Sequence, residues 1–200
     1  KSFSNKPRKQ KCKTIFKESY QEIMNLEKLK YPIGKVEIPE KITKKNIEDW
    51  ISLIERFPQE LEFLTKDLSE NQLDTPYREG GWSIRQVIHH CYDSHQNSYT
   101  RFKWALTEDN PLIKVYFEER WAELHDSKSM PIFLSTDALK ALHSKWVYLL
   151  RGLTEEQLNK TFIHPSGNEV VGLKENIGIY AWHCRHHYHH IEQLMIRKGW

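Results

Sequence analysis

Apolar residues recur at helical spacing along most of the chain from residue 46 onward. In the first such stretch they fall three or four residues apart, or at sums of these steps: Ile47, Trp50, Ile51, Ile54, Leu61 and Leu64. Pro58 lies inside this pattern, and because proline lacks a backbone N–H we expect it to kink or split the helix. A second long helix should begin at residue 84, since Ser83-x-x-Gln86 matches the capping box of helix starts.

The rest of the pattern predicts two further main helices, at residues 133–151 and 172–197. Residues 108–130, which separate the second and third helices, form a long crossover with a short helix near Glu118–Leu124. No stretch alternates over enough residues to require a sheet, so residues 161–171 are expected to form a loop with at most a small turn of extended chain. We therefore predict an all-α fold, a four-helix bundle with a long crossover between helices two and three.

The domain organisation follows from the same pattern. Residues 31–200 should form the bundle, and residues 1–30 a basic N-terminal extension with a short helix at 15–29. One internal similarity supports two helix pairs of similar architecture. Residues 67–73 resemble residues 152–158, and each segment follows a long helix and precedes a loop and another helix.

Composition and charge narrow the class of protein. The chain has 200 residues, 38% of them hydrophobic, and its 30 basic against 27 acidic side chains give a formal charge of +3. This balance favours neither nucleic acid nor membrane as a partner, and the basic run in residues 1–13 is interpreted as a solvated tail. The three cysteines, Cys12, Cys91 and Cys184, do not resemble a disulfide framework, and the N-terminus lacks the apolar core of a signal peptide. We expect a cytoplasmic protein.

Histidines supply the candidate chemistry, since five of the eleven lie between residues 182 and 190. On a helix that turns by about 100° per residue, His183 and His187 point about 40° apart, toward the apolar side of the predicted fourth helix. Two imidazoles at i and i+4 are a common way for a helix to chelate one metal ion. His186 and His190 form a competing pair that is less centred on the apolar face.

A helix chelate needs further ligands, and the helix from residue 84 offers His89, His90 and His95. Periodicity does not choose among these three. Residues four, seven and eleven positions after His90 would form a polar seam leading away from the site: Ser94, Asn97 and Arg101. Three imidazole ligands suit Zn²⁺ or Ni²⁺, and the absence of a CxxC pair or of paired Glu-x-x-His motifs disfavours a closed cysteine site or ferritin-like chemistry.

The segment from Leu73 to His95, LDTPYREGGWSIRQVIHHCYDSH, resembles the DinB superfamily and its YfiT-like branch in particular. The resemblance covers residues 30–200 and is reinforced by YPIG at Tyr31, by WAEL at Trp121 and by YAWHCRHH at Tyr180. It implies a four-helix bundle with three histidine metal ligands, the first of them eight residues after the tryptophan of a GW[ST] turn.

Carried onto this sequence, the family pattern implies His90, His183 and His187 as the ligands of one divalent ion per chain. Members of the branch are described as metal-dependent hydrolases or as transferases of small thiols such as bacillithiol, and are usually cytoplasmic homodimers. The sequence departs from the pattern in its N-terminal extension and at Phe117, where an acidic residue is expected.

Three functions follow as hypotheses. The first is transfer of a small thiol to an electrophile, with the thiol bound by the polar seam of Ser94, Asn97 and Arg101. The second is hydrolysis by an activated water, with His186 or His190 as the general base, since no carboxylate is evident near the ligands. The third is a non-catalytic protein with a closed site completed by a fourth ligand, His190 or His95.

Overall fold

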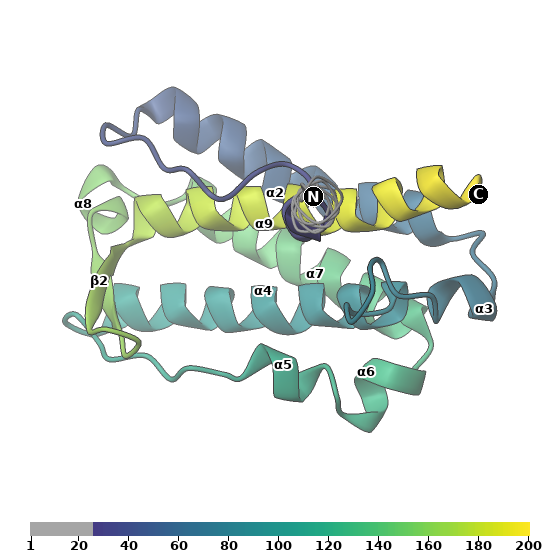
Figure 1. The fold of residues 1–200 in the computed structure, drawn as a ribbon. Helices are drawn as coiled ribbons and strands as arrows, with labels where there is room; N and C mark the ends of the chain where they lie inside the picture. The colour runs from purple at the N-terminus through teal and green to yellow at the C-terminus, as the bar shows by residue number, and fades with distance from the viewer. Residues whose placement is uncertain (1–25) are drawn as a thin grey trace, which may run out of the picture.

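A computed structural model describes residues 26–200, in which four long helices form a bundle (Figure 1). The helices are α2 (Lys44–Thr65), α4 (Ile84–Thr107), α7 (Ile132–Arg151) and α9 (Leu173–Lys198). Helix α2 packs against α7 and α9, and α4 packs against the same two, so α2 and α4 lie on one diagonal of the bundle. The predicted four-helix bundle is confirmed: α2 and α4 begin within two residues of their expected starts, and α7 and α9 lie within one residue of their expected bounds.

Helix α2 begins at a capping box, in which the backbone N–H of Asn46 donates to Thr43 Oγ1 at 3.2 Å and the N–H of Thr43 donates to Asn46 Oδ1 at 2.9 Å. The helix continues through Pro58 without interruption, so a split at this proline does not occur. Ile54 and Leu61 are fully buried on either side of Pro58. This burial holds both halves of the helix against α7 and α9 although one helical hydrogen bond is missing.

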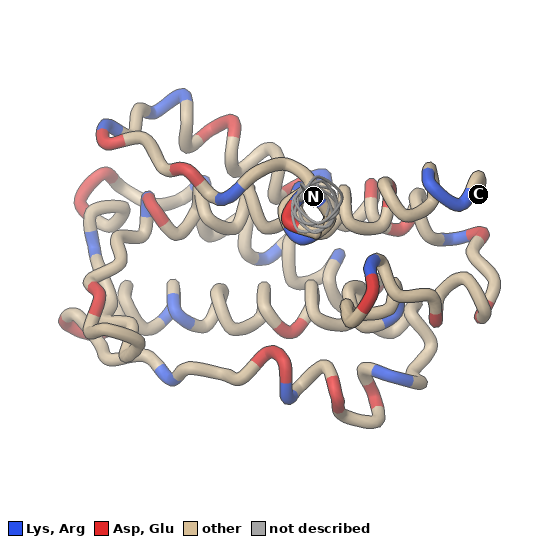
Figure 2. Tube along the Cα trace, viewed as in Figure 1, with Lys and Arg blue, Asp and Glu red and all other residues tan. Residues whose placement is uncertain are grey.

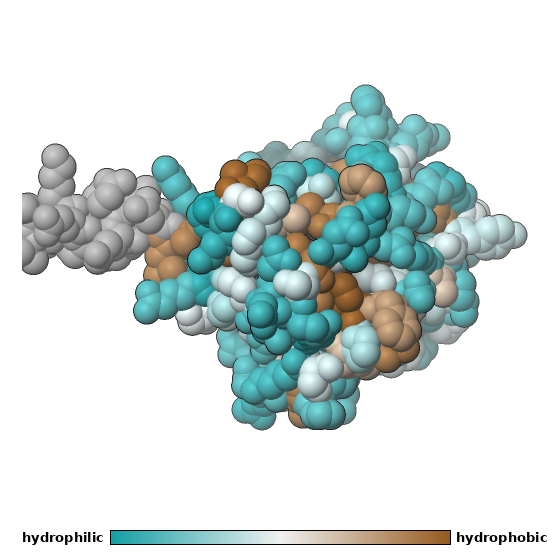
Figure 3. All heavy atoms as spheres, turned by 90° about the vertical axis from the view of Figure 1, so that its right-hand side faces the viewer, coloured by the Kyte–Doolittle hydropathy of each residue, from teal (hydrophilic) through white to brown (hydrophobic). Residues whose placement is uncertain are grey.

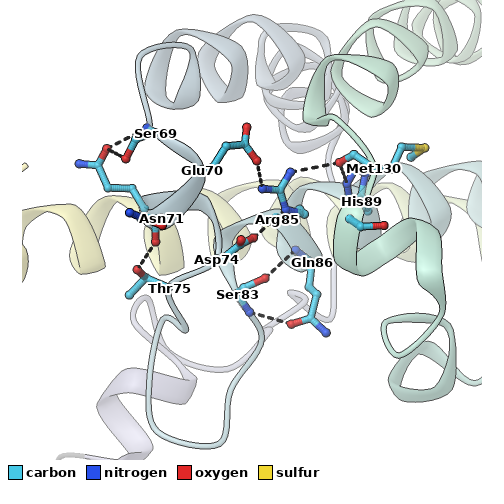
Figure 4. Close-up of polar contacts among 12 residues, drawn as sticks. Ser69, Glu70, Asn71, Asp74, Thr75, Ser83, Arg85, Gln86, His89 and Met130 are labelled. Carbon is cyan, nitrogen blue, oxygen red and sulfur yellow. Dashed lines mark hydrogen bonds and ion pairs between the residues drawn. The ribbon is translucent and has the colours of Figure 1, made fainter.

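Helix α4 begins as predicted at Ser83, whose side chain caps Gln86 in a complete capping box. In the first turn of α4, the buried guanidinium of Arg85 forms ion pairs with Glu70 and Asp74 and donates to the carbonyl of Met130 at 3.2 Å (Figure 4). These contacts tie the start of α4 to the loop before it and to the segment that leads into α7.

The crossover between α4 and α7 runs beside α4 (Figure 1) and contains two short helices, α5 (Glu118–Trp121) and α6 (His125–Ser129). The internal similarity between residues 67–73 and 152–158 also has a structural counterpart. Helices α3 (Glu70–Leu73) and α8 (Glu155–Leu158) each follow a long helix, and each begins with a capping box.

The region expected to be a loop contains a β-hairpin of β1 (Thr161–His164) and β2 (Glu169–Gly172), which is a correction to the prediction. The strands are antiparallel with Thr161 opposite Gly172, and the turn uses Gly167 at a φ of +82°. Phe162 is buried against the bundle. Four-residue strands are too short to show a clear alternation, which explains why the pattern did not predict them.

Residues 1–25 lie outside the described part of the chain, and with them the basic run and most of the helix expected at 15–29. Residues 26–30 are helical. Among the described residues, none of the helices combines the length and apolar character of a transmembrane span. Acidic and basic residues are interspersed over the described chain (Figure 2), and the end of the bundle near the C-terminus is mostly hydrophilic with a central apolar band (Figure 3).

Candidate metal centre

Three histidine side chains converge between α4 and α9. One ring nitrogen from each of His90, His183 and His187 lies within 4.8 Å of the others. The Nε2 atoms of His90 and His183 are 3.2 Å apart, and the ring centroids of His183 and His187 are 4.4 Å apart. The structure thus brings together the three residues that the resemblance implies as ligands.

The position of His90 is set by the first turns of α4. The preceding residue, His89, is buried and contacts Ser135 Oγ at 2.7 Å and the Met130 carbonyl at 3.0 Å. Its ring therefore points toward α7, while His90 faces α9. The ring of Trp82 packs on His90 with the centroids 4.6 Å apart. Neighbouring positions on α4 thus serve different purposes, and only His90 reaches the centre directly.

A tight turn places Trp82 over His90. The N–H of Tyr77 donates to the carbonyl of Trp82 at 3.0 Å, which closes the turn. A Cβ atom at Gly81 would lie 2.7 Å from Arg78 Cγ and 3.2 Å from the Arg78 carbonyl oxygen. Only glycine fits here, which accounts for the Gly–Gly–Trp sequence before α4.

The register of α9 against α4 is fixed by two buried contacts. The hydroxyl of Tyr180 donates to the carbonyl of Ser94 at 3.1 Å, and Asn176 Nδ2 donates to Ser98 Oγ at 3.0 Å. Tyr180 precedes His183 by one helical turn, so this register presents His183 opposite His90.

Burial keeps the three imidazoles neutral. It lowers the pKa of His90 to about 3, and it holds the pKa values of His183 and His187 well below their usual range, with neighbouring rings adding to the effect. Neutral imidazoles carry one lone pair each and can bind a metal without first losing a proton.

The donor set fits a divalent cation. Tetrahedral coordination with bonds of about 2.05 Å separates ligand nitrogens by about 3.3 Å. The His90–His183 separation of 3.2 Å is close to this value. Two acceptor nitrogens at this distance would repel unless a proton or a cation lies between them.

The centre lies in a cavity of about 870 Å³. Arg101 lines it and is buried, and its Nε has no hydrogen-bond partner within residues 26–200. Ser94 also lines the cavity, with its Oγ 3.4 Å from His183 Nε2. The two residues are seven positions apart and so lie about 20° apart around α4. A cation and a hydroxyl thus face the space next to the three imidazoles.

Asn97 does not line the cavity, contrary to its predicted role in catalysis and cofactor binding. It lies about 60° around the helix from Ser94. Its Nδ2 donates to the carbonyl of Asp93 at 2.8 Å, a contact within α4 itself. The structure therefore gives no support to Asn97 as a binding residue.

His186 and His190 both line the cavity on the open side of the centre. His190 Nε2 contacts the carbonyl of Lys30 at 3.0 Å, and its ring stacks on Tyr77 with the centroids 4.0 Å apart. His186 Nδ1 is buried and has no partner in the described part of the chain. Together with His187 these two form a second group of close ring nitrogens.

Sequence reasoning missed several cavity residues. Tyr180 could have been found from its place one turn before His183. Several others come from the crossover and the hairpin and had no periodicity to orient them: Tyr116, Glu118, Glu119, Glu123 and His164. Burial raises the pKa of Tyr116, which therefore stays a neutral phenol. Phe117, the departure from the family pattern, is exposed and precedes α5.

Cys91 and Cys184 are fully buried, as predicted for small core residues, and form no disulfide within residues 26–200. Burial raises the pKa of both thiols, Cys91 with a further contribution from Asp93 and Cys184 from Cys91. Neither belongs to a group of convergent ligands among residues 26–200. They contribute to packing and not to the centre.

Fold and site together define the class: helical bundles with a candidate three-histidine metal centre at the inner end of a cavity. The chain belongs to the DinB superfamily, whose family model matches residues 53–191. A curated relative from Bacillus cereus, named "Putative metal-dependent hydrolase", is 54% identical over 172 residues, covering 86% of this chain and 98% of the relative. A Bacillus anthracis relative with the same name matches equally well, with 54% identity and the same coverage.

Among solved structures, the chain is similar to YfiT from Bacillus subtilis, described as "a probable metal-dependent hydrolase with an unusual four-helix bundle topology". The TM-score is 0.85 at 45% identity, and the match covers 86% of this chain and 99% of YfiT. The expected YfiT-like fold is confirmed.

Proposed function

We propose that this protein is a metal-dependent enzyme that transfers a low-molecular-weight thiol, of the bacillithiol kind, to an electrophilic small molecule. One observation carries the proposal: three neutral imidazoles and the guanidinium of Arg101, whose Nε has no partner within residues 26–200, face the same cavity of about 870 Å³. The ion would be held by His90, His183 and His187, and Zn²⁺ and Ni²⁺ both suit imidazole ligands.

A divalent ion in this position supplies Lewis acidity, which lowers the pKa of a coordinated thiol or water. The chain's own residues bind the thiol and the electrophile. Arg101 binds a carboxylate of the thiol, since its charge has no partner in the described residues and a buried cation gains from an anionic ligand. The neutral phenol of Tyr116 can donate a hydrogen bond to the electrophile. The cavity volume falls within the range that holds a drug-sized ligand.

The test measures conjugation of bacillithiol with a model electrophile by metal-loaded and metal-stripped protein. We expect acceleration only with metal. Arg101→Gln should raise the KM for the thiol by about 10- to 100-fold, as expected for loss of a charged hydrogen bond, without weakening metal binding. Asn97→Ala, on the same helix but outside the cavity, is the matched control and should change the KM little. Equal rates with and without metal would overturn the proposal.

Hydrolysis is the second candidate, because the relatives carry the name of metal-dependent hydrolases and Glu118, Glu119 and Glu123 line the cavity. A carboxylate among them could accept a proton from an attacking water. Metal-dependent cleavage of esters or amides without any thiol, lost on Glu118→Gln, Glu119→Gln or Glu123→Gln, would favour hydrolysis over transfer.

A closed, non-catalytic centre finds less support. No fourth histidine, cysteine or carboxylate of residues 26–200 joins the group of His90, His183 and His187. His95 and His190, the residues considered for that role, make other contacts. The homodimer stays a prediction, which sedimentation equilibrium of the metal-loaded protein tests.

A further inference from the structure

A chain of hydrogen bonds runs from the candidate metal centre through the core and takes one residue from each long helix. His183 Nδ1 lies 2.9 Å from His95 Nε2, His95 Nδ1 lies 2.6 Å from His143 Nε2, and His143 Nδ1 lies 2.5 Å from the Ile54 carbonyl oxygen. We call these four residues the buried histidine chain. They come from α9, α4, α7 and α2 in that order.

The end of the chain is a carbonyl that Pro58 leaves without its helical donor. In an α-helix the N–H of residue 58 would donate to the carbonyl of residue 54. Proline has no N–H, so the Ile54 carbonyl has no partner within α2. It is fully buried, and His143 supplies the missing donor. This explains why a proline is found in the middle of a continuous helix.

A carbonyl oxygen only accepts hydrogen bonds, and this fixes the direction of the whole chain. His143 must donate from Nδ1, so a neutral His143 accepts at Nε2. His95 must then donate from Nδ1 and accept at Nε2. His183 in turn donates from Nδ1, which leaves its lone pair on Nε2, the atom that lies 3.2 Å from His90 Nε2.

We propose that the buried histidine chain fixes the proton of His183 on Nδ1 and thereby keeps its Nε2 lone pair facing the metal centre. His95 and His143 are then positioning residues for a ligand. With the opposite tautomer of His183, two lone pairs would face each other, or the bond to Ile54 would break. Either leaves a buried polar atom unsatisfied, which native structures rarely tolerate.

The surroundings favour a fixed arrangement. His95 and His143 are almost fully buried, and the ring of Phe57 packs on both, with centroid distances of 5.5 and 5.9 Å. Trp146 covers His95 and His143 edge-on from α7. All four ring nitrogens of His95 and His143 already have partners at 2.9 Å or less, so none of them is free for another hydrogen bond. Outer-shell partners of metal-bound histidines commonly act through such contacts.

The expected effect on metal affinity rests on the proposed metal centre, whereas the expected position of the proton on His183 does not. The first test therefore uses the metal-free wild-type protein labelled with ¹⁵N-histidine. Two-bond ¹H–¹⁵N correlation spectra distinguish the two neutral tautomers. We expect His183, His95 and His143 all to carry the proton on Nδ1. A proton on Nε2 of His183 would overturn the proposal, whether or not the protein binds metal.

The second test compares two substitutions of buried histidines. His143→Phe keeps the packing against Phe57 but removes both chain contacts. His89→Phe is the matched control, since His89 is also buried and makes two hydrogen bonds away from the chain. Zn²⁺ affinity is measured by competition with a chelator, and unfolding by urea is followed in parallel.

We expect His143→Phe to weaken Zn²⁺ binding by about 10- to 100-fold, the usual effect of losing an outer-shell partner, and His89→Phe by less than about threefold. The tautomer of His183 should become mixed only in His143→Phe. Equal losses in both variants, with the tautomer unchanged, would show a merely structural role. If His143→Phe does not fold, the wild-type tautomer alone decides. If wild-type protein binds no Zn²⁺, the proposed function fails while the tautomer still tests the chain.

Discussion

The two candidate ligands that α9 contributes, His183 and His187, differ in the hydrogen bonds that support their rings. Behind His183, the buried histidine chain makes three contacts of 2.9 Å or less and ends on the Ile54 carbonyl in the core. Behind His187, the contact with His190 joins two Nδ1 atoms at 3.4 Å, and His190 then reaches the carbonyl of Lys30 at 3.0 Å. Both chains end on a carbonyl, but Ile54 is fully buried whereas Lys30 is only half-buried.

This difference suggests that the core side and the cavity side of the centre have different roles. The core side holds His183 in one orientation, because each ring nitrogen of His95 and His143 makes a single hydrogen bond. The cavity side contains a ring, His186, whose Nδ1 has no partner in the described residues, and a contact at the limit of hydrogen bonding. That side can change its hydrogen bonds when a small molecule enters the cavity without disturbing His183.

The largest effect should come from removing a ligand itself. His183→Ala is expected to weaken Zn²⁺ binding by more than about 100-fold, beyond the effect of an outer-shell change, since two imidazoles cannot hold the ion as three do. Metal content after dialysis against a weak chelator provides the measurement. Full occupancy in His183→Ala would refute the assignment of the centre, and His186→Ala serves as the neighbouring control.

A pH series should show how the stability of the protein depends on neutral histidine rings buried on the core side and on the cavity side of the centre. Burial lowers the pKa of His143 and of His190 to about 4, and neighbouring charges lower that of His190 further. Because the unfolded chain then binds more protons, stability is fully present above about pH 6.5 and falls as pH drops toward 4. Each such ring contributes up to about 1.4 kcal/mol per pH unit. Urea unfolding of metal-free protein at pH 7.5, 6.5 and 5.5 measures the slope, and equal stability at all three values would contradict it.

The open side should matter less than the core side. His190→Phe keeps the stack on Tyr77 but removes the contacts with His187 and Lys30. We expect Zn²⁺ affinity to fall by about three- to tenfold, the low end for an outer-shell partner and less than for His143→Phe. Chelator competition on both variants gives the ratio. A greater loss in His190→Phe would reverse the proposed order of the two sides.

The smallest effect is expected from Pro58→Ala. Alanine restores an N–H that competes with His143 for the Ile54 carbonyl, which can accept two hydrogen bonds. Zn²⁺ affinity should fall by no more than about threefold. The free energy of unfolding should rise, because proline costs about 3 kcal/mol in a helix interior relative to alanine. A lower stability in this variant would show that proline itself is needed for packing.

The sequence predicted those parts of the fold that depend on local periodicity. The long helices and the start of α4 at Ser83 follow from apolar spacing and a capping box. The hairpin of β1 and β2 did not, because strands of four residues are too short for a pattern to show. The hydrogen bond that satisfies the Ile54 carbonyl beside Pro58 comes from His143, 85 positions after Pro58, and local spacing does not predict that contact.

The candidate site was also predictable only in those parts that depend on local helix geometry. The pairing of His183 with His187 follows from helix geometry alone, whereas the choice among His89, His90 and His95 required a resemblance. Their separate roles depend on which helix each ring faces. The carboxylates and Tyr116 of the crossover were beyond prediction, since an irregular segment gives no indication of its orientation.

The place of Pro58 has a practical consequence for anyone who wishes to make this protein more robust. A proline in the middle of a regular helix is the first residue that a stabilisation campaign would replace, and an assay of melting temperature would reward the change. Selection on heat resistance alone would thereby accept the loss of up to about threefold in Zn²⁺ affinity that we expect for Pro58→Ala, because a melting assay does not register it. Variants of this protein should be screened for metal retention alongside thermal tolerance.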